Sequence, residues 1–322
     1  MTPGLPILAG MDMLATYVGP GRLVLPGRPF TRREALGWGL RDADLAAGVA
    51  SGTLQHPMRG VYYGAHLEED LALRIACLKC VVPEDAVVTD RTAAWLLGAP
   101  RVLAPGDHLV VPKVSVFRRP GYRLRNGLTR SGERSFGPDD VMSIDGIEVT
   151  TPLRTALDVG RLLHRDQALG VMDALQRQHG FTNDELILGA DRFKRARGVV
   201  QLRDLAPHVD GRSGSPAESA TRSKWLRIPS VPKPDLQIEV ASPFGSYFLD
   251  LGVPHLKYAV EYDGEDFHGE EDEPHDRQRR AWIRRRHGWI IDVVRKGNLF
   301  GVHGDVEGII ISGIEAARRR LR

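Results

Sequence analysis

The chain is poor in cysteine and has no long apolar run. Its only two cysteines, Cys77 and Cys80, lie in "LALRIACLKCVV", which has the pattern of a helix. A thioredoxin-type site would instead follow a strand and precede a helix, so this pattern favours two buried core thiols over a redox pair. No stretch approaches the roughly 20 apolar residues that cross a bilayer, which excludes a membrane-spanning helix.

The first residues also lack the marks of a signal peptide. Residues 1–16 contain no basic stretch, and they are interrupted by Pro3, Gly4, Pro6 and Gly10. A secretory signal needs a basic start followed by a continuous apolar segment. We therefore expect a cytoplasmic protein with no membrane partner.

The chain carries little net charge for its size. The formal charge is +3 and the sequence pI is about 8.9, which permits a nucleic-acid partner without demanding one. The charge is unevenly placed, however. Residues 261–276 are acidic, whereas 277–286 and 318–322 are strongly basic.

The sequence also has no internal repeats and no low-complexity segments, which favours a series of distinct domains. Its 322 residues are 42% hydrophobic, enough for two or three domains with cores of their own. The Gly/Ser/Pro cluster at 211–216 has the composition of a domain joint. We expect a loose arm at 1–29, a winged helix-turn-helix at 30–66, an α/β middle domain at 67–210 and a carboxyl-terminal α/β domain at 211–322.

The second segment has the order helix, turn, helix, strand. Thr31 and Glu34 form a T-x-x-E capping box that opens the first helix. A second helix runs from Asp42 to Gly52, and a strand ends at Val61-Tyr62-Tyr63. This order is typical of a winged helix-turn-helix.

Basic residues in this segment are candidates for nucleic-acid contacts: Arg32, Arg33 and Arg59. The second helix, however, carries Asp42 and Asp44 where a helix that reads bases would need Arg, Lys, Asn or Gln. Packing against a partner protein, or against the rest of the chain, therefore remains an alternative for this segment.

The last segment predicts an α/β sandwich with the order α-β-β-β-α-β-α over about 110 residues. If the hairpin in "FLDLGVPHLKYAVEYDG" turns at 254–257, residues whose numbers sum to 511 face each other. Asp250 then lies opposite Glu261, and Asp263 shares their face because side chains alternate along a strand. Like charges across a ladder are destabilising unless a proton is shared or a cation lies between them.

Oxygen ligands of this kind suit Mg²⁺ or Mn²⁺ rather than zinc. Glu218, in the first turns of the preceding helix, is the third candidate ligand beside Asp250 and Glu261. A metal held there would activate water and stabilise charge on a phosphodiester. The following helix offers phosphate contacts from Arg277, Arg280 and Arg284, together with Arg279, Arg285 and Arg286. Glu265, Asp266 and Glu270–Glu273 are interpreted as a solvated loop.

The runs "SPAES", "RSKWL", "FLDLGVPHLKYAVEYDGEDFH" and "DRQRRAWIRRRHGWIIDVVR" resemble the very-short-patch-repair-like branch of the PD-(D/E)XK nuclease superfamily. The resemblance covers the last third of the chain. It implies that Glu218, Asp250 and Glu261 bind the metal, with Asp263 and His268 near the scissile phosphate. Asp263 stands where the superfamily usually has lysine, and His268 could serve instead as an acid–base group or phosphate ligand.

The amino-terminal run "FTRREALGWGLRDADLAAGVASGTLQHPMRGVYY" resembles the winged helix of AbiEi-like type IV antitoxins. "DRTAAWLLGA" and "VTTPLRTALDVGR" resemble segments of the middle domain of the same proteins. Three functions follow as hypotheses. The first is a metal-dependent nuclease acting on nucleic acid, with DNA as the expected substrate. The second is an antitoxin-like regulator with an inactive nuclease fold and a possible toxin partner. The third is a protein scaffold in phage defence.

Overall fold

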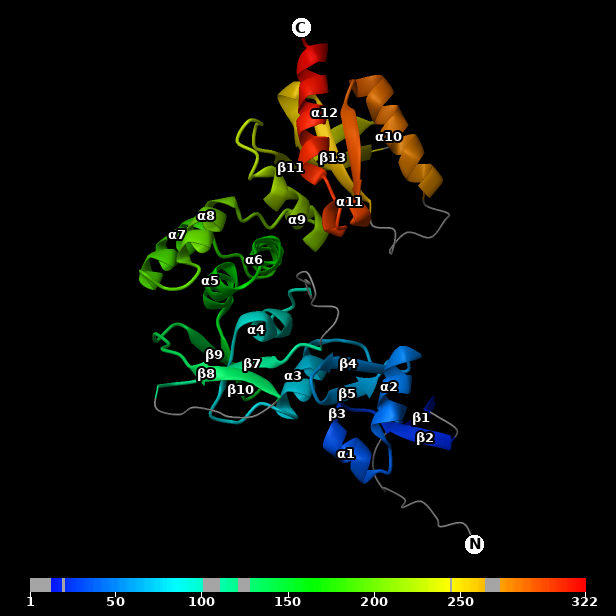
Figure 1. The fold of residues 1–322 in the computed structure, drawn as a ribbon, viewed down its shortest axis with the longest axis vertical. Helices are drawn as coiled ribbons and strands as arrows, with labels where there is room; N and C mark the ends of the chain where they lie inside the picture. Colours follow the sequence, from blue (N-terminus) through cyan, green and yellow to red (C-terminus); the bar gives the residue numbers. More distant parts are fainter. Residues whose placement is uncertain (1–12, 19–20, 101–110, 121–127, 244, 264–272) are drawn as a thin grey trace. The chain divides into compact units, whose positions relative to one another are not determined.

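The computed structural model describes residues 13–18, 21–100, 111–120, 128–243, 245–263 and 273–322 (Figure 1). The chain divides into two compact units. One comprises residues 1–98 and 106–155, and the other residues 99–105 and 156–322. The predicted division into four segments remains a prediction. Among the described residues, no helix has the length and apolar character needed to span a membrane.

The first unit begins with two small sheets. Strands β1 (Met13–Val18) and β2 (Gly21–Pro26) form an antiparallel hairpin within the segment expected to be a loose arm. A three-stranded sheet follows in the order β3-β5-β4. It is formed by β3 (Phe30–Thr31), β4 (Leu54–Met58) and β5 (Val61–Gly64), with helices α1 (Arg32–Gly37) and α2 (Asp42–Ala50) between β3 and β4.

The predicted capping box at the start of α1 is confirmed. The Thr31 hydroxyl accepts from the Glu34 amide at 3.1 Å, and the Glu34 carboxylate accepts from the Thr31 amide at 2.8 Å. Both bonds satisfy amides that a helix start leaves unpaired. Phe30, Leu45 and Tyr62 form a core between the helices and the sheet. Naming this arrangement a winged helix remains a prediction.

A five-stranded sheet completes the first unit, in the order β8-β7-β6-β10-β9. Cys77 is fully buried in its core and Cys80 is half-buried, as expected of core thiols. The elements are α3 (Leu71–Lys79), β6 (Val87–Val88), α4 (Asp90–Leu96), β7 (Val114–Arg118), β8 (Thr129–Glu133), β9 (Val141–Ile144) and β10 (Ile147–Thr150).

Helix α5 (Pro152–Leu162) belongs to both units, because the division between them falls after Thr155. The second unit continues with a helical layer. It consists of α6 (Arg165–His179), α7 (Asn183–Ala190), the short helix η2 (Asp191–Phe193), α8 (Val199–Leu205) and the short helix η3 (Ala206–His208). Gly180 ends α6 in the left-handed conformation, with φ of 74°.

The rest of the second unit has the predicted α-β-β-β-α-β-α order, with two additional short helices. Its four strands lie in the order β11-β12-β13-β14, and β13 and β14 are parallel. The elements are α9 (Pro216–Trp225), β11 (Asp235–Ser242), β12 (Gly245–Val253), η4 (Pro254–Leu256), β13 (Tyr258–Asp263), α10 (Glu273–His287), β14 (Ile290–Arg295), α11 (Lys296–Phe300) and α12 (Val306–Arg320).

The predicted register of the β12–β13 hairpin is confirmed. Leu251 pairs with Val260 and Val253 with Tyr258, so facing numbers sum to 511 as expected. Each face of the sheet has its own core. Trp225 of α9 and Ile314 of α12 pack on one face, whereas Ile283 of α10 packs on the other. Helices on both faces make this part a three-layer sandwich, and the chain as a whole is a mixed α/β protein, as predicted.

Candidate functional site

Three of the predicted site residues come together around the two central strands of the four-stranded sheet. Asp250 lies on β12 and Glu261 on the neighbouring strand β13. The backbone amide of Tyr262 donates to the Asp250 carboxylate at 2.9 Å, which fixes that side chain against β13. Glu218 approaches from the first turn of α9, close enough to repel the Asp250 charge.

This crowding of acids changes the acidity of Asp250. Burial and the charges of Glu218 and Glu261 raise its pKa from 3.8 to about 8. The Tyr262 amide and the Arg279 guanidinium act in the opposite direction. Asp250 therefore experiences the charges of both other carboxylates.

Glu261 is held by two arginines of α10. It is 3% exposed, and both of its oxygens accept from Arg279 Nη2 at 2.9 Å. Arg280 Nη1 lies 3.4 Å from the second oxygen. Burial raises the pKa of Glu261, and the two guanidinium charges oppose that rise. Arg279 also donates to the carbonyl of Phe248 at 3.1 Å, so it bridges two strands.

Asp263, the residue at the usual lysine position, lies 3.6 Å from Arg280 Nη2. Arg280 is 6% exposed, and its guanidinium is directed at the carboxylates of Glu261 and Asp263. These two carboxylates neutralise its charge in this arrangement. Its role in phosphate binding remains a prediction. His268 lies outside the described residues.

Gln237 is a site residue that the sequence did not indicate. Its Nε2 donates to Glu218 at 3.2 Å, and Glu218 also accepts from the Gly214 amide at 2.8 Å. Gln237 has φ of 49°, the left-handed region that costs a side-chain-bearing residue energy. It lies between Leu236 and Ile238, whose partners are Leu251 and Leu249, so it is opposite Asp250.

In this arrangement Glu261 is not free to bind a divalent cation. Hard cations need several free carboxylate oxygens, whereas both oxygens of Glu261 accept from Arg279. Within the described ranges, no three His, Cys, Asp or Glu side chains are grouped as a metal site. The Mg²⁺ or Mn²⁺ site expected at Glu218, Asp250 and Glu261 therefore remains a prediction.

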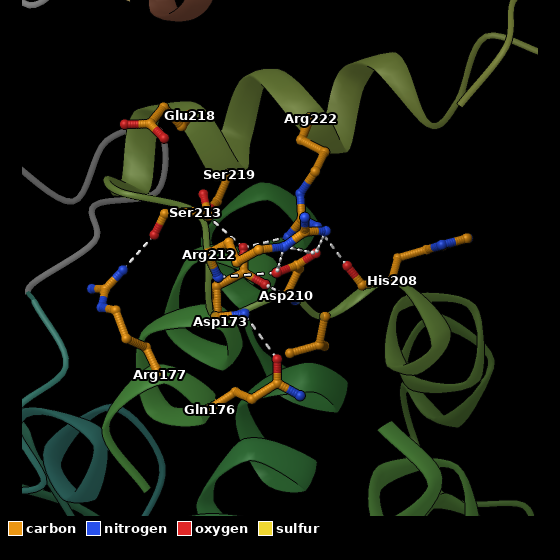
Figure 2. Close-up of polar contacts among 12 residues, drawn as sticks. Asp173, Gln176, Arg177, His208, Asp210, Arg212, Ser213, Glu218, Ser219 and Arg222 are labelled. Carbon is orange, nitrogen blue, oxygen red and sulfur yellow. Dashed lines mark hydrogen bonds and ion pairs between the residues drawn. The ribbon is translucent and has the colours of Figure 1, made fainter. Parts of the chain in front are cut away.

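A buried polar network fixes α9, the helix that carries Glu218, against α6 (Figure 2). Asp173 is 1% exposed and accepts from the Arg222 guanidinium, the Ser219 hydroxyl and the Asp210 amide. Burial raises the pKa of Asp173, and the charge of Arg222 opposes the rise. Arg222 also donates to the carbonyl of His208 at 2.8 Å. The predicted joint at 211–216 is therefore bridged by buried contacts.

The remaining arginines predicted to contact nucleic acid are exposed. Arg277 and Arg284 lie on α10, and Arg284 donates to the carbonyl of Ile291 at 2.6 Å. In the first unit, Arg33 and Arg59 are exposed, and Arg32 forms two bonds with Asp42, at 2.6 and 2.7 Å.

Beyond its first turn, helix α2 exposes no side chain suited to reading bases. The exposed residues there are Ala46, Ala47, Val49 and Ala50. Asp44, near its start, pairs with Arg41 at 3.0 Å. Base edges are read by hydrogen-bonding side chains, so this surface supports the alternative that α2 packs against a protein.

Comparison with known protein families shows that part of the chain is similar to an antitoxin domain. Residues 85–207 match the family model described as the AbiEi antitoxin C-terminal domain. The matched range begins just before β6 and ends in η3. It contains both segments, 90–99 and 149–161, on which the antitoxin resemblance of the middle domain rests. That part of the resemblance is supported, whereas the comparisons give no support to the nuclease resemblance.

Two curated relatives cover most of the chain. They are the uncharacterized proteins MT2308 and Rv2248 of Mycobacterium tuberculosis, from strains CDC 1551 / Oshkosh and ATCC 25618 / H37Rv. Each is 29% identical over 255 residues, which are 77% of this chain and 89% of the relative. The similarity therefore extends well beyond the matched domain.

Proposed function

We propose that this protein is an antitoxin-like regulator that binds nucleic acid. In this proposal the carboxyl-terminal sandwich binds DNA or a partner protein and does not cleave phosphodiesters. The match of residues 85–207 with the AbiEi antitoxin C-terminal domain carries the proposal. A toxin or another defence protein is the expected protein partner.

The contacts of Glu261 support this function over hydrolysis. Metal-assisted hydrolysis needs a cation that activates water, and the cation needs free carboxylate oxygens. Arg279 and Arg280 already neutralise Glu261. Asp263 at the usual lysine position further weakens the case for catalysis, since it cannot stabilise negative charge in a transition state.

Binding and cleavage assays on the same DNA test the proposal. The full chain is titrated into labelled duplex DNA in EDTA, and the same duplex is then incubated with millimolar Mg²⁺ or Mn²⁺. We expect binding in EDTA and no cleavage product with either metal. Metal-dependent product that disappears in Asp250→Ala, and persists in the exposed control Glu307→Ala, would contradict the proposal.

A metal-dependent nuclease is the second candidate, and the raised pKa of Asp250 favours it. Strongly perturbed acids gather at catalytic sites, because such sites place like charges together in partly buried positions. Glu218, Asp250 and Glu261 form such a group. This function requires Glu261 to be released by Arg279, so Arg279→Ala should then have higher metal-dependent cleavage than the parent.

A further inference from the structure

The carboxyl ends of α10 and α12 lie at the same end of the four-stranded sheet (Figure 1). Lys257, in the turn before β13, donates from Nζ to the carbonyl of His287 at 2.9 Å. Arg320, in the last turn of α12, donates from Nη1 to the carbonyl of Gly288 at 3.0 Å. Three segments that are distant in sequence therefore meet where α10 ends.

Exposed positive charge is concentrated at this meeting point. We call this surface the basic end, and it consists of Lys257, Arg284, Arg285, Arg286, Arg318, Arg319 and Arg320. All of these residues are exposed. Arg318 also donates to the carbonyl of Ser230 at 3.4 Å, so the surface extends toward the loop after α9.

The positive charge of the basic end is larger than the negative charge that surrounds it. Glu315 lies 3.7 Å from Arg319, and Asp292 is within electrostatic reach of Arg284. Each helix end adds only about half a negative charge, so the two ends together add about one. Seven basic side chains therefore outnumber the negative charge beside them. Since like charges repel, this excess points to an anionic partner rather than to stability.

The basic end is separate from the carboxylates. Lys257 precedes β13, and Glu261 is four residues further on, about 13 Å along the strand. On α10, Arg279 contacts Glu261 and Arg286 lies about 10 Å further along the helix axis. A ligand on the basic end therefore need not enter the group formed by Asp250 and Glu261.

We propose that the basic end binds the phosphate backbone of duplex DNA without reading its sequence. This inference rests on the proposed function and adds the surface and the form of nucleic acid. Arginine and lysine contacts to phosphate provide affinity but little sequence information. Single-strand sites stack bases on aromatic side chains, whereas on α10 the Trp282 ring packs against His287, with ring centroids 5.1 Å apart. Trp282 also packs edge-on against Tyr247, with ring centroids 5.7 Å apart.

Two variants with matched charge test the surface. The first removes three exposed cations from the basic end: Arg285→Ala, Arg286→Ala and Arg319→Ala. The control removes three from the exposed connection between η2 and α8: Lys194→Ala, Arg195→Ala and Arg197→Ala. Both sets lie in the second unit and change the net charge equally. The single reversals Arg286→Glu and Lys194→Glu provide a second pair if either triple variant folds poorly by circular dichroism.

Fluorescence anisotropy measures the affinity of the full chain for a mixed-sequence duplex from about 50 to 200 mM NaCl. We expect the basic-end variant to bind at least about tenfold more weakly at the lower salt concentration. The slope of log affinity against log salt should also fall by about 2 to 3, because each lost phosphate contact removes about 0.9. The control should stay within about twofold of the parent, which is small against a three-contact loss.

The outcomes separate this inference from the proposed function. A parent that binds no nucleic acid contradicts the proposed function itself. If the parent binds DNA but the basic-end variant binds as tightly as the parent, the assignment of the basic end is wrong. The assignment is also wrong if the control loses as much affinity as the basic-end variant, or if only the control loses affinity. Tighter binding of the parent to single-stranded DNA or duplex RNA overturns the choice of duplex DNA.

Discussion

Arg279 donates from one guanidinium nitrogen to both carboxylate oxygens of Glu261, at 2.9 Å each. The carboxylate lies on a buried strand and the guanidinium on the helix that covers it. The same arginine donates to the carbonyl of Phe248 on β12. Because both oxygens of Glu261 accept from Arg279, they are not free to bind a cation. The hydrogen bonds of Arg279 also join α10 to both β12 and β13.

Arg279→Ala should destabilise the second unit. Removing one partner of a buried ion pair leaves an uncompensated charge, and Arg280 can compensate only in part. We expect a loss of about 1–3 kcal/mol in the free energy of unfolding, measured with urea. Arg277→Ala, an exposed change on the same helix, should stay within about 0.5 kcal/mol of the parent. Equal effects of the two changes would mean that the Glu261 contact does not stabilise the fold.

Asp250→Asn should stabilise the protein at alkaline pH. The unfolded carboxyl loses its proton near pH 3.8, whereas the folded one keeps it until about pH 8. The folded state therefore binds more protons between these values, so the contribution of Asp250 to stability falls as pH rises. Asparagine carries no charge and can still accept from the Tyr262 amide. We expect a gain of about 1–3 kcal/mol at pH 8 and little change near pH 4.

Urea unfolding of the parent and Asp250→Asn across this pH range, in EDTA, measures the difference directly. Groups outside the carboxylate cluster affect both proteins alike, so the difference between them reports Asp250 together with its coupling to Glu218 and Glu261. Asp235→Asn, an exposed change on β11, serves as the control. A difference that does not grow between pH 4 and pH 8 would falsify the raised pKa.

The Asp173–Arg222 pair should show strong energetic coupling. Asp173→Leu leaves the buried Arg222 guanidinium without its carboxylate partner, and we expect a loss of about 3–5 kcal/mol. Arg222→Met should cost a similar amount, because it leaves Asp173 unpaired. The double change Asp173→Leu with Arg222→Met removes both charges and should cost clearly less than the sum of the single changes. Additive losses in urea unfolding would contradict a direct contact.

Two glycines of the second unit have a left-handed backbone conformation, and replacing each with alanine should destabilise the protein to different degrees. A Cβ at Gly198 would lie 1.8 Å from the carbonyl oxygen of Arg161, whereas a Cβ at Gly180 meets open space. Their φ angles are nearly equal, 76° and 74°, so the conformational cost is shared. We expect Gly180→Ala to cost about 1 kcal/mol, and Gly198→Ala to cost at least about 2 kcal/mol more because the backbone must move. Thermal unfolding of the two variants gives the comparison.

The sequence predicted the hairpin register but missed how the carboxylates are held. A short turn at 254–257 sets that register, so the pairing of β12 with β13 could be worked out from numbering alone. Arg279 was assigned to phosphate binding together with the other arginines of its helix. Helical spacing offered a signal, since Arg279 and Arg280 precede the buried Ile283 by four and three residues. They therefore share its inward face.

Other features had no signal in the pattern. Gln237 lies in a run that alternates like an ordinary strand, and its left-handed backbone depends on contacts with Glu218 from another element. The joint at 211–216 has the composition of a linker because glycine and serine suit tight turns. In the structure its neighbours Asp210 and Ser219 hydrogen-bond to Asp173. Composition predicts that the chain bends at this joint, but it does not predict whether the residues around the bend are fixed by hydrogen bonds.

Helix α5 determines how the protein can be divided for study. It begins at Pro152, and the two units divide after Thr155, inside its first turns. A fragment beginning at Ala156 would lose the first turn of α5, so the amides at its new helix start would have no intrahelical acceptors and would fray. A fragment beginning at Thr151 keeps the helix whole but removes Asp140, the buried partner of Arg154. Fragments made for expression should therefore retain residues 139–162 together, so that α5 and the partner of Arg154 stay in one piece.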